Sequence, residues 1–321
     1  MPHPQRPLNT EQERYRCRGA FVTLPQLLEQ RHAARDLELD YSSRTRLGMA
    51  GAHISKIKGR GVDFEEHRAY QPGDDIRTID WRVTARTGRP FTKVFREERE
   101  RPVIIGVDQS RNMYFGSQVA FKSVVAAEAA AILCWTTVDN GDRVGGVVFS
   151  QNEQQLIKPR RSRRSALRLL NTLADRSQAL VADHTTHESG SGYLRAALEQ
   201  IHRITRPGSN VYLISDFNDY DADCARYIQQ LALHNNVTCV LIYDALEENL
   251  PRPGVYSITD GVTRSVIDTH ARRVRERYHA GFSERIRTLQ TALARMQVPL
   301  ITVRTDQSVM AQLQTWKQKT R

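Results

Sequence analysis

The stretch Pro102-Val103-Ile104-Ile105-Gly106-Val107-Asp108 decides the fold of this chain. It is a continuous apolar run that ends in a carboxylate, and a strand that is buried on both faces requires such a run. A second run of the same kind, Val211 to Ser215, is followed by Asp216. Because the carboxyl ends of parallel strands meet at one edge of a sheet, the two runs predict a parallel sheet with both aspartates at that edge.

Helices alternate with short apolar strands along the rest of the chain. The Ala-rich segment 119–138 has the pattern of a helix, and a turn at 140–142 leads into an apolar strand at 143–149. Further strands are predicted at 155–158, 238–243 and 298–304, and further helices at 165–174, 193–204, 224–234, 271–296 and 309–317. This alternation predicts an α/β fold, a doubly wound and mainly parallel sheet with helices on both faces.

The first hundred residues have a different pattern. Leucines at helical spacing predict an amphipathic helix within 21–39, and Gly, Arg and Asp between short β-like pieces predict small strands and ordered loops over 42–101. We therefore expect a flexible tail (1–18), an Arg-rich N-terminal module (19–101), an α/β domain (102–308) and a C-terminal helix (309–321).

The chain is basic, with 47 Lys and Arg residues against 36 Asp and Glu residues and a net charge of +11. Such a charge suits nucleic acid, an anionic membrane face or an acidic protein partner. The sharpest basic run, Lys158 to Arg164, lacks the interleaved aromatic residues of a nucleic-acid stacking platform. We interpret this run as a solvated face and keep nucleic-acid binding as an alternative.

The sequence predicts a cytoplasmic protein without a transmembrane segment. No stretch approaches the roughly 20 apolar residues that cross a bilayer, and the polar start lacks the apolar segment of a signal peptide. The cysteines are scattered, and two of them lie in apolar runs where a cysteine behaves as a buried hydrophobe. The four are Cys17, Cys134, Cys224 and Cys239.

Hard oxygen ligands follow the two buried strands. The first strand continues as Asp108-Gln109-Ser110, and the second as Ser215-Asp216. Mg²⁺ takes about six oxygens, so two carboxylates and hydroxyls on adjacent loops suit Mg²⁺ or Mn²⁺, and an open position then accepts a partner's carboxylate. The alternative is that the two aspartates only cap loops by accepting backbone N–H bonds.

These residues resemble the metal-ion-dependent adhesion site of the von Willebrand factor A domain. The resemblance implies a von Willebrand factor A-like fold with Asp108, Ser110 and Asp216 at the metal. The family has a second serine where this chain has Asn112, which would offer a carbonyl oxygen. It has a threonine where this chain has Gly192, and we expect Ser191 or Thr186 to supply that hydroxyl.

A longer resemblance starts upstream, in GRGVDFEEHRAYQPGDDIRTIDWR at 59–82, which is followed by Thr84-Ala85-Arg86. This run is similar to the signature of the bacterial family called domain of unknown function 58, and the likeness spans roughly 24–306. Members of that family work beside MoxR-type AAA+ ATPases, which are thought to assist the assembly of other complexes. The resemblance implies such an ATPase and a client protein complex as partners.

Charged side chains dominate the signature. Pro72-Gly73-Asp74 has the composition of a tight turn, and it is expected to bring Asp74 and Asp75 close to Arg68 and Arg77. Forked guanidinium groups pair with carboxylates, so the segment is predicted to be held by a charge lattice, with Tyr70 and Trp81 anchoring it against the sheet. The alternative is a partner-docking face made of Arg68, Asp74, Arg77, Arg82 and Arg86.

No motif of a common enzyme class stands out. The sequence contains neither a Gly-x-Ser-x-Gly elbow nor a phosphate loop of the Gly-x-x-x-x-Gly-Lys type. We therefore expect a non-enzymatic adaptor that binds proteins through a degenerate metal-ion-dependent adhesion site. The alternatives are a basic nucleic-acid-binding protein and a metal-dependent hydrolase, which would also need a general base.

Overall fold

The computed structural model describes residues 15–35, 37, 62–71, 76–97, 101–182, 191–259 and 264–320. The chain forms two units: Thr45–Glu100 is the smaller, and Met1–Arg44 with Arg101–Arg321 is the larger. The predicted module 19–101 is therefore divided. Its helix α2 (Leu24–Ala34) belongs to the larger unit because it packs on α5 (Lys122–Asp139) of that unit.

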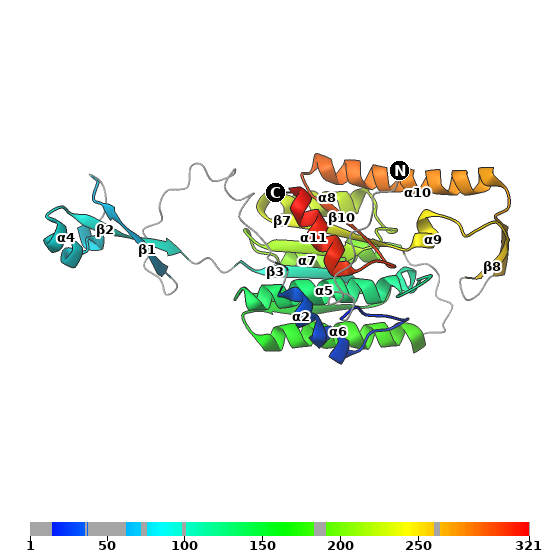
Figure 1. Cartoon of the computed structure of the whole chain (residues 1–321), viewed down its shortest axis with the longest axis horizontal. Helices are drawn as coiled ribbons and strands as arrows, with labels where there is room; N and C mark the ends of the chain where they lie inside the picture. The colour runs from blue at the N-terminus through cyan, green and yellow to red at the C-terminus, as the bar shows by residue number, and fades with distance from the viewer. Residues whose placement is uncertain are drawn as a thin grey trace. The chain divides into compact units, whose positions relative to one another are not determined.

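A six-stranded sheet in the order β10-β7-β6-β3-β4-β5 forms the centre of the larger unit (Figure 1). Every neighbouring pair is parallel except β4 and β5, which are antiparallel. The strands are β3 (Val103–Asp108), β4 (Val144–Phe149), β5 (Gln154–Arg160), β6 (Asn210–Ser215), β7 (Asn236–Tyr243) and β10 (Leu300–Arg304). The predicted mainly parallel α/β sheet is confirmed.

Helices cover both faces of this sheet, and each face has its own apolar core. On one face α2, α5, α6 (Arg163–Ala182) and α11 (Val309–Thr320) pack together. On the other, α7 (Tyr193–Ile204), α8 (Ala222–His234) and α10 (Arg272–Arg295) cover the strands. Small alanine side chains let α5 lie close to the sheet, and α5 is buried from Lys122 to Thr137.

The N-terminal segment is fastened to the larger unit. The indole Nε1 of Trp135 donates a hydrogen bond to the Leu27 carbonyl, 3.0 Å away, and joins α5 to α2. Upstream of α2, the backbone N–H of Cys17 donates to Glu128 Oε2, and the Cys17 side chain is buried. The predicted flexible tail 1–18 therefore extends too far, because Cys17 is held in the larger unit. Residues 1–14 lie outside the described residues.

The smaller unit contains the antiparallel strands β1 (Val62–Ala69) and β2 (Phe91–Glu97), the short helix η1 (Ile76–Thr78), and α4 (Trp81–Thr87). The carboxylate of Asp80 caps α4 by accepting the backbone N–H groups of Arg82 and Val83. Within the smaller unit, Trp81, which we expected as a buried anchor, is 66% exposed.

Four short elements of the larger unit were not predicted. The helix α9 (Ala245–Glu248) follows β7, and β8 (Val255–Thr259) pairs antiparallel with β9 (Arg264–Asp268). A further short helix, η2 (Arg111–Met113), follows β3. In the described part of the chain, every helix is too short or too polar to span a lipid bilayer.

Candidate functional site

The predicted aspartates meet at the carboxyl edge of the sheet. The chain runs from β3 through β4 to β5 on one side, and it returns on the other side of β3 as β6. A reversal of this kind is the usual position of a binding site in an open α/β sheet. Asp108 ends β3 and Ser215 ends β6, and Ser215 Oγ donates a hydrogen bond to Asp108 Oδ2 over 2.6 Å.

Asp108 lies completely within the protein, with 0% of its surface exposed. Besides the Ser215 hydroxyl, it accepts the backbone N–H of Ser110, which lies 2.8 Å from Oδ1. Burial and the nearby charge of Asp216 raise the pKa of Asp108 to about 7. Both carboxylate oxygens are thus engaged within the protein, as the loop-capping alternative predicts.

Asp216 is also buried, and an ammonium group lies against it. Its Oδ2 accepts hydrogen bonds from Lys122 Nζ at 2.9 Å and from Asn218 Nδ2 at 2.7 Å, while Oδ1 accepts the Asn218 backbone N–H. Lys122 is the first residue of α5, and its ammonium also contacts Glu247 Oε1 at 2.9 Å. The sequence had not pointed to Lys122 or Glu247.

Lys122 is 1% exposed, so its charge has almost no contact with solvent. Burial by itself lowers the pKa of a lysine, but the carboxylates of Asp216 and Glu247 outweigh it, and the pKa of Lys122 is raised above its ordinary value. The side chain is therefore a fixed cation. The sequence places Lys122 at the start of an Ala-rich helix, but it does not show that this helix is buried from Lys122 to Thr137.

The other predicted ligands are only partly in place. Ser110 is buried beside Asp108, and its Oγ has no hydrogen-bond partner of good geometry among the described residues. Asn112 is exposed, and its amide donates to the hydroxyl of Tyr193, 3.3 Å away. Gly192 offers no side chain, and its backbone N–H donates to Asp219. Ser191 is exposed, and Thr186 lies outside the described residues.

This donor set does not fit a divalent cation. Mg²⁺ or Mn²⁺ requires about six oxygens, but each carboxylate oxygen of both aspartates already accepts a hydrogen bond from the protein, and the position of the family's threonine has no hydroxyl. The Lys122 ammonium would also repel a metal beside Asp216. Within the described ranges, no three His, Cys, Asp or Glu side chains gather closely enough to hold a metal ion.

A third aspartate strengthens the same edge. Asp244 follows β7, is fully buried, and accepts hydrogen bonds from Ser117 N, Thr305 Oγ1 and Leu246 N. Burial alone would raise its pKa, but these hydrogen bonds prevail and lower it. The rule that located Asp108 and Asp216, a carboxylate directly after a buried strand, would have found Asp244 as well.

The predicted docking residues belong to the smaller unit. Arg68 Nη1 donates to Gln71 Oε1 over 3.3 Å, and the side chains of Arg77 and Arg82 are exposed. Asp74 and the predicted tight turn lie outside the described residues. Both the charge lattice and the docking face therefore stay predictions.

The basic run spans the end of β5 and the start of α6 in the larger unit. Its charged side chains are all exposed, as expected for a solvated face. They are Lys158, Arg160, Arg161, Arg163 and Arg164.

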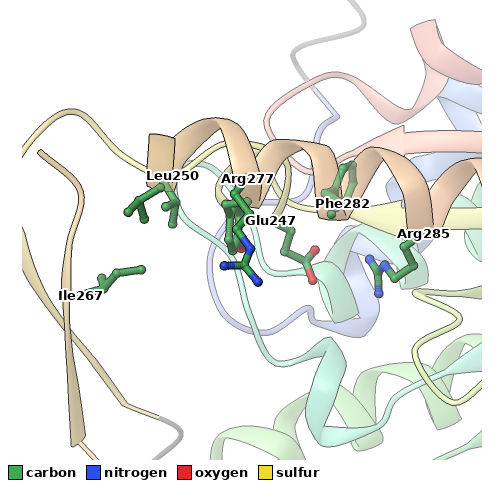
Figure 2. Close-up of a pocket in the computed structure, with 9 residues that line it drawn as sticks. Glu247, Leu250, Ile267, Arg277, Phe282 and Arg285 are labelled. Carbon is green, nitrogen blue, oxygen red and sulfur yellow. The ribbon is translucent and has the colours of Figure 1, made fainter. Parts of the chain in front are cut away.

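A groove of about 630 Å³ lies between α9, the β8–β9 hairpin and α10, next to Glu247. In the view of Figure 2, Arg277 and Arg285 extend from α10 on either side of Glu247, and Leu250 and Ile267 lie at one end. The lining is completed by Val274, Tyr278, Gly281 and Phe282. The groove thus combines apolar and aromatic surface with two guanidinium groups.

Residues 66–287 match the family described as Protein of unknown function DUF58. The uncharacterized protein Rv1480 of Mycobacterium tuberculosis is 29% identical over 286 residues, which cover 88% of this chain and 86% of that protein. The uncharacterized protein Mb1516 of Mycobacterium bovis has the same identity and coverage.

Solved structures with low sequence identity also match parts of this chain. The conserved hypothetical protein BatB from Bacteroides thetaiotaomicron is 18% identical with a TM-score of 0.40, and the match covers 68% of this chain and 97% of that chain. The von Willebrand factor type A structure from Catenulispora acidiphila is 19% identical with a TM-score of 0.30, and the match covers 48% of this chain and 35% of that chain.

Proposed function

We propose that this chain, which belongs to the DUF58 family of proteins of unknown function, is a non-enzymatic, protein-binding adaptor of the cytoplasm. It works with a MoxR-type AAA+ ATPase in the assembly or maturation of other protein complexes. The family resemblance supplies the identity of the ATPase. The groove beside Glu247 is the observation on which the proposal depends.

The two arginines of the groove are available to a partner. Among the described residues, neither Arg277 nor Arg285 forms an ion pair, and Arg285 only stacks over the ring of Phe282, 5.5 Å from its centre. Glu247 does not neutralise them, because Lys122 Nζ binds its Oε1 and the Asp244 backbone N–H binds its Oε2. Arginines beside aromatic rings are common energetic centres of protein interfaces.

The surface around the groove favours a peptide with both acidic and apolar residues. The aliphatic side chains of Leu250, Ile267 and Val274 line the groove, and Val274 is exposed at the start of α10. Apolar side chains that lie together on a protein surface often mark a site of interaction with another molecule. Aliphatic lining suits a protein side chain better than a nucleotide base, so the proposed ligand is an acidic, apolar segment of the partner.

The chemistry of the chain supports binding rather than catalysis. Burial raises the pKa of all four cysteine thiols, to about 12 for Cys134 and Cys224, so none of them is an activated nucleophile. The four thiols are also unpaired, which suits a reducing compartment. Asp108 and Asp216 are buried and accept hydrogen bonds from protein donors.

The test is a binding measurement between the full-length chain and the MoxR-type ATPase of the same organism, by isothermal titration calorimetry. The variants Arg277→Ala and Arg285→Ala should each raise Kd about tenfold or more, as expected for arginines at an interface centre. Arg272→Ala is the matched control, because Arg272 lies on the same helix but is paired with Glu276 and does not line the groove. Its Kd should stay within about twofold.

The possible outcomes separate the parts of the proposal. If the wild-type chain does not bind the ATPase, the adaptor function with that partner is wrong. If it binds and the two groove variants bind equally well, the groove is the wrong surface. Tight binding of double-stranded DNA that weakens steeply with added salt would favour the nucleic-acid alternative instead.

A further inference from the structure

The strand ends of this sheet concentrate negative charge in a buried place. Asp108 and Asp216 lie at the ends of neighbouring strands, and Glu247 approaches from α9. Uncompensated charges are costly to bury, so an arrangement of this kind needs a cation. The described part of the chain offers one buried ammonium there, on Lys122.

The local structure does not otherwise explain a lysine at position 122. It is the first residue of α5, where the helix dipole disfavours a positive charge. Its neighbours on the helix are apolar or small, and lysine is seldom fully buried unless it is paired. Its contacts with two carboxylates from different elements, at 2.9 Å each, account for its position.

We propose that the ammonium of Lys122 takes the place of the divalent metal ion at this edge of the sheet, so that the site is closed and metal-independent. The side chain brings one charge on a covalent tether and donates hydrogen bonds. A bound metal would instead leave a coordination position open for a partner's carboxylate. A lysine offers no such position, and partner recognition must therefore use another surface.

The remaining residues agree with this substitution. Asn112 has no hydroxyl, and Gly192 has no side chain, so neither position supplies the hydroxyl that the family's serine and threonine would bring to a metal. The site thus lacks hydroxyl groups that a metal would need, and it contains the Lys122 ammonium, which supplies positive charge in place of a metal.

The probe for the test is MnCl₂ alone, with no partner protein present, so the result does not depend on the adaptor proposal. The wild-type chain should show no saturable Mn²⁺ binding by calorimetry or electron paramagnetic resonance, and neither Mn²⁺ nor EDTA should shift its Tm. In Lys122→Ser, the freed carboxylates and the new hydroxyl should bind Mn²⁺. The Tm of this variant should start below that of the wild type and rise by about 5 °C with saturating Mn²⁺.

Two further variants make the comparison specific. Lys122→Arg keeps the charge and should stay insensitive to Mn²⁺. Lys158→Ser removes an exposed lysine and should behave as the wild type. Saturable Mn²⁺ binding by the wild type that is lost in Asp216→Asn would overturn the proposal, as would a folded Lys122→Ser that ignores Mn²⁺. If Lys122→Ser does not fold, the wild-type and Asp216→Asn titrations still decide.

Discussion

The hydroxyl of Ser215 lies 2.6 Å from the carboxylate of Asp108 and donates a hydrogen bond to it, which joins the ends of β6 and β3. The same oxygen accepts the backbone N–H of Phe217, whose φ of 53° places it in the left-handed region. Non-glycine residues rarely adopt this conformation, and it costs about 1–3 kcal/mol. The Ser215 side chain thus helps to hold a strained turn directly after Asp216.

Replacing Ser215 should destabilise the fold. In Ser215→Ala, the buried carboxylate of Asp108 and the N–H of Phe217 both lose a partner, so we expect a loss of about 1–3 kcal/mol in the free energy of unfolding. Urea denaturation measures this directly. The control is Ser150→Ala, which changes a hydroxyl in a surface turn and should stay within about 0.5 kcal/mol. Equal effects in both variants would contradict a special role for Ser215.

The pKa of Asp108 predicts a stability that depends on pH. This pKa is about 7 in the folded chain against 3.8 for a free side chain, so between these values the native state holds a proton that the unfolded state has lost. The stabilisation from the protonated carboxyl is complete below about pH 4 and disappears as the pH rises to 7. Asp108→Asn mimics the protonated form and lacks this loss.

Denaturation of the wild type and Asp108→Asn at several pH values tests this point. The stability of the wild type relative to the variant should fall as the pH increases from 4 to 7, with a slope of up to about 1.4 kcal/mol per pH unit. A difference that is constant over this range, or that changes in the opposite direction, would show that the Asp108 carboxyl is already ionised at pH 4.

The two tryptophans at 81 and 135 should respond differently to truncation. Trp135 is 5% exposed and bonded to the Leu27 carbonyl, so Trp135→Ala should cost about 3–5 kcal/mol. Trp81 is exposed, and Trp81→Ala should change the stability by no more than about 0.5 kcal/mol. Differential scanning calorimetry of both variants provides the comparison. A large loss in Trp81→Ala would mean that the ring is buried in solution.

Gly281 offers a stabilising substitution within α10. An added Cβ meets nothing within 4 Å, and glycine inside a helix costs about 0.5–1 kcal/mol relative to alanine. Gly281→Ala should therefore raise the free energy of unfolding by about that amount. Guanidinium denaturation of the variant beside the wild type gives the value, and a loss of stability would indicate that α10 requires a different backbone at this position.

The sheet and the meeting of Asp108 with Asp216 could be predicted from sequence. Both aspartates follow apolar runs long enough to be buried strands, and the topology of parallel sheets places such positions at one edge. The cation at that edge was harder to foresee. A lysine at the start of an Ala-rich helix looks solvated unless the helix is known to be buried on all sides, as α5 is from Lys122 to Thr137.

The groove was not foreseen for a related reason. The helix α9 has four residues, too few to produce a periodic pattern, and the hairpin strands expose Val255 and Val266 instead of alternating buried and exposed positions. The sequence around Glu247 therefore gave no indication that this residue lies close to Asp216. The link passes through Lys122, which is more than 90 positions away from either carboxylate.

One ammonium group, that of Lys122, binds Glu247 beside the groove and Asp216 at the end of β6. The electrostatic energy of either carboxylate therefore depends on the position of the other. A ligand that draws Glu247 away from Lys122 changes the strength with which the same group holds the end of β6. By thermodynamic reciprocity, a perturbation at the strand end must alter the affinity of the groove by the same factor. The groove and the buried end of β6 are thus connected through the single side chain of Lys122.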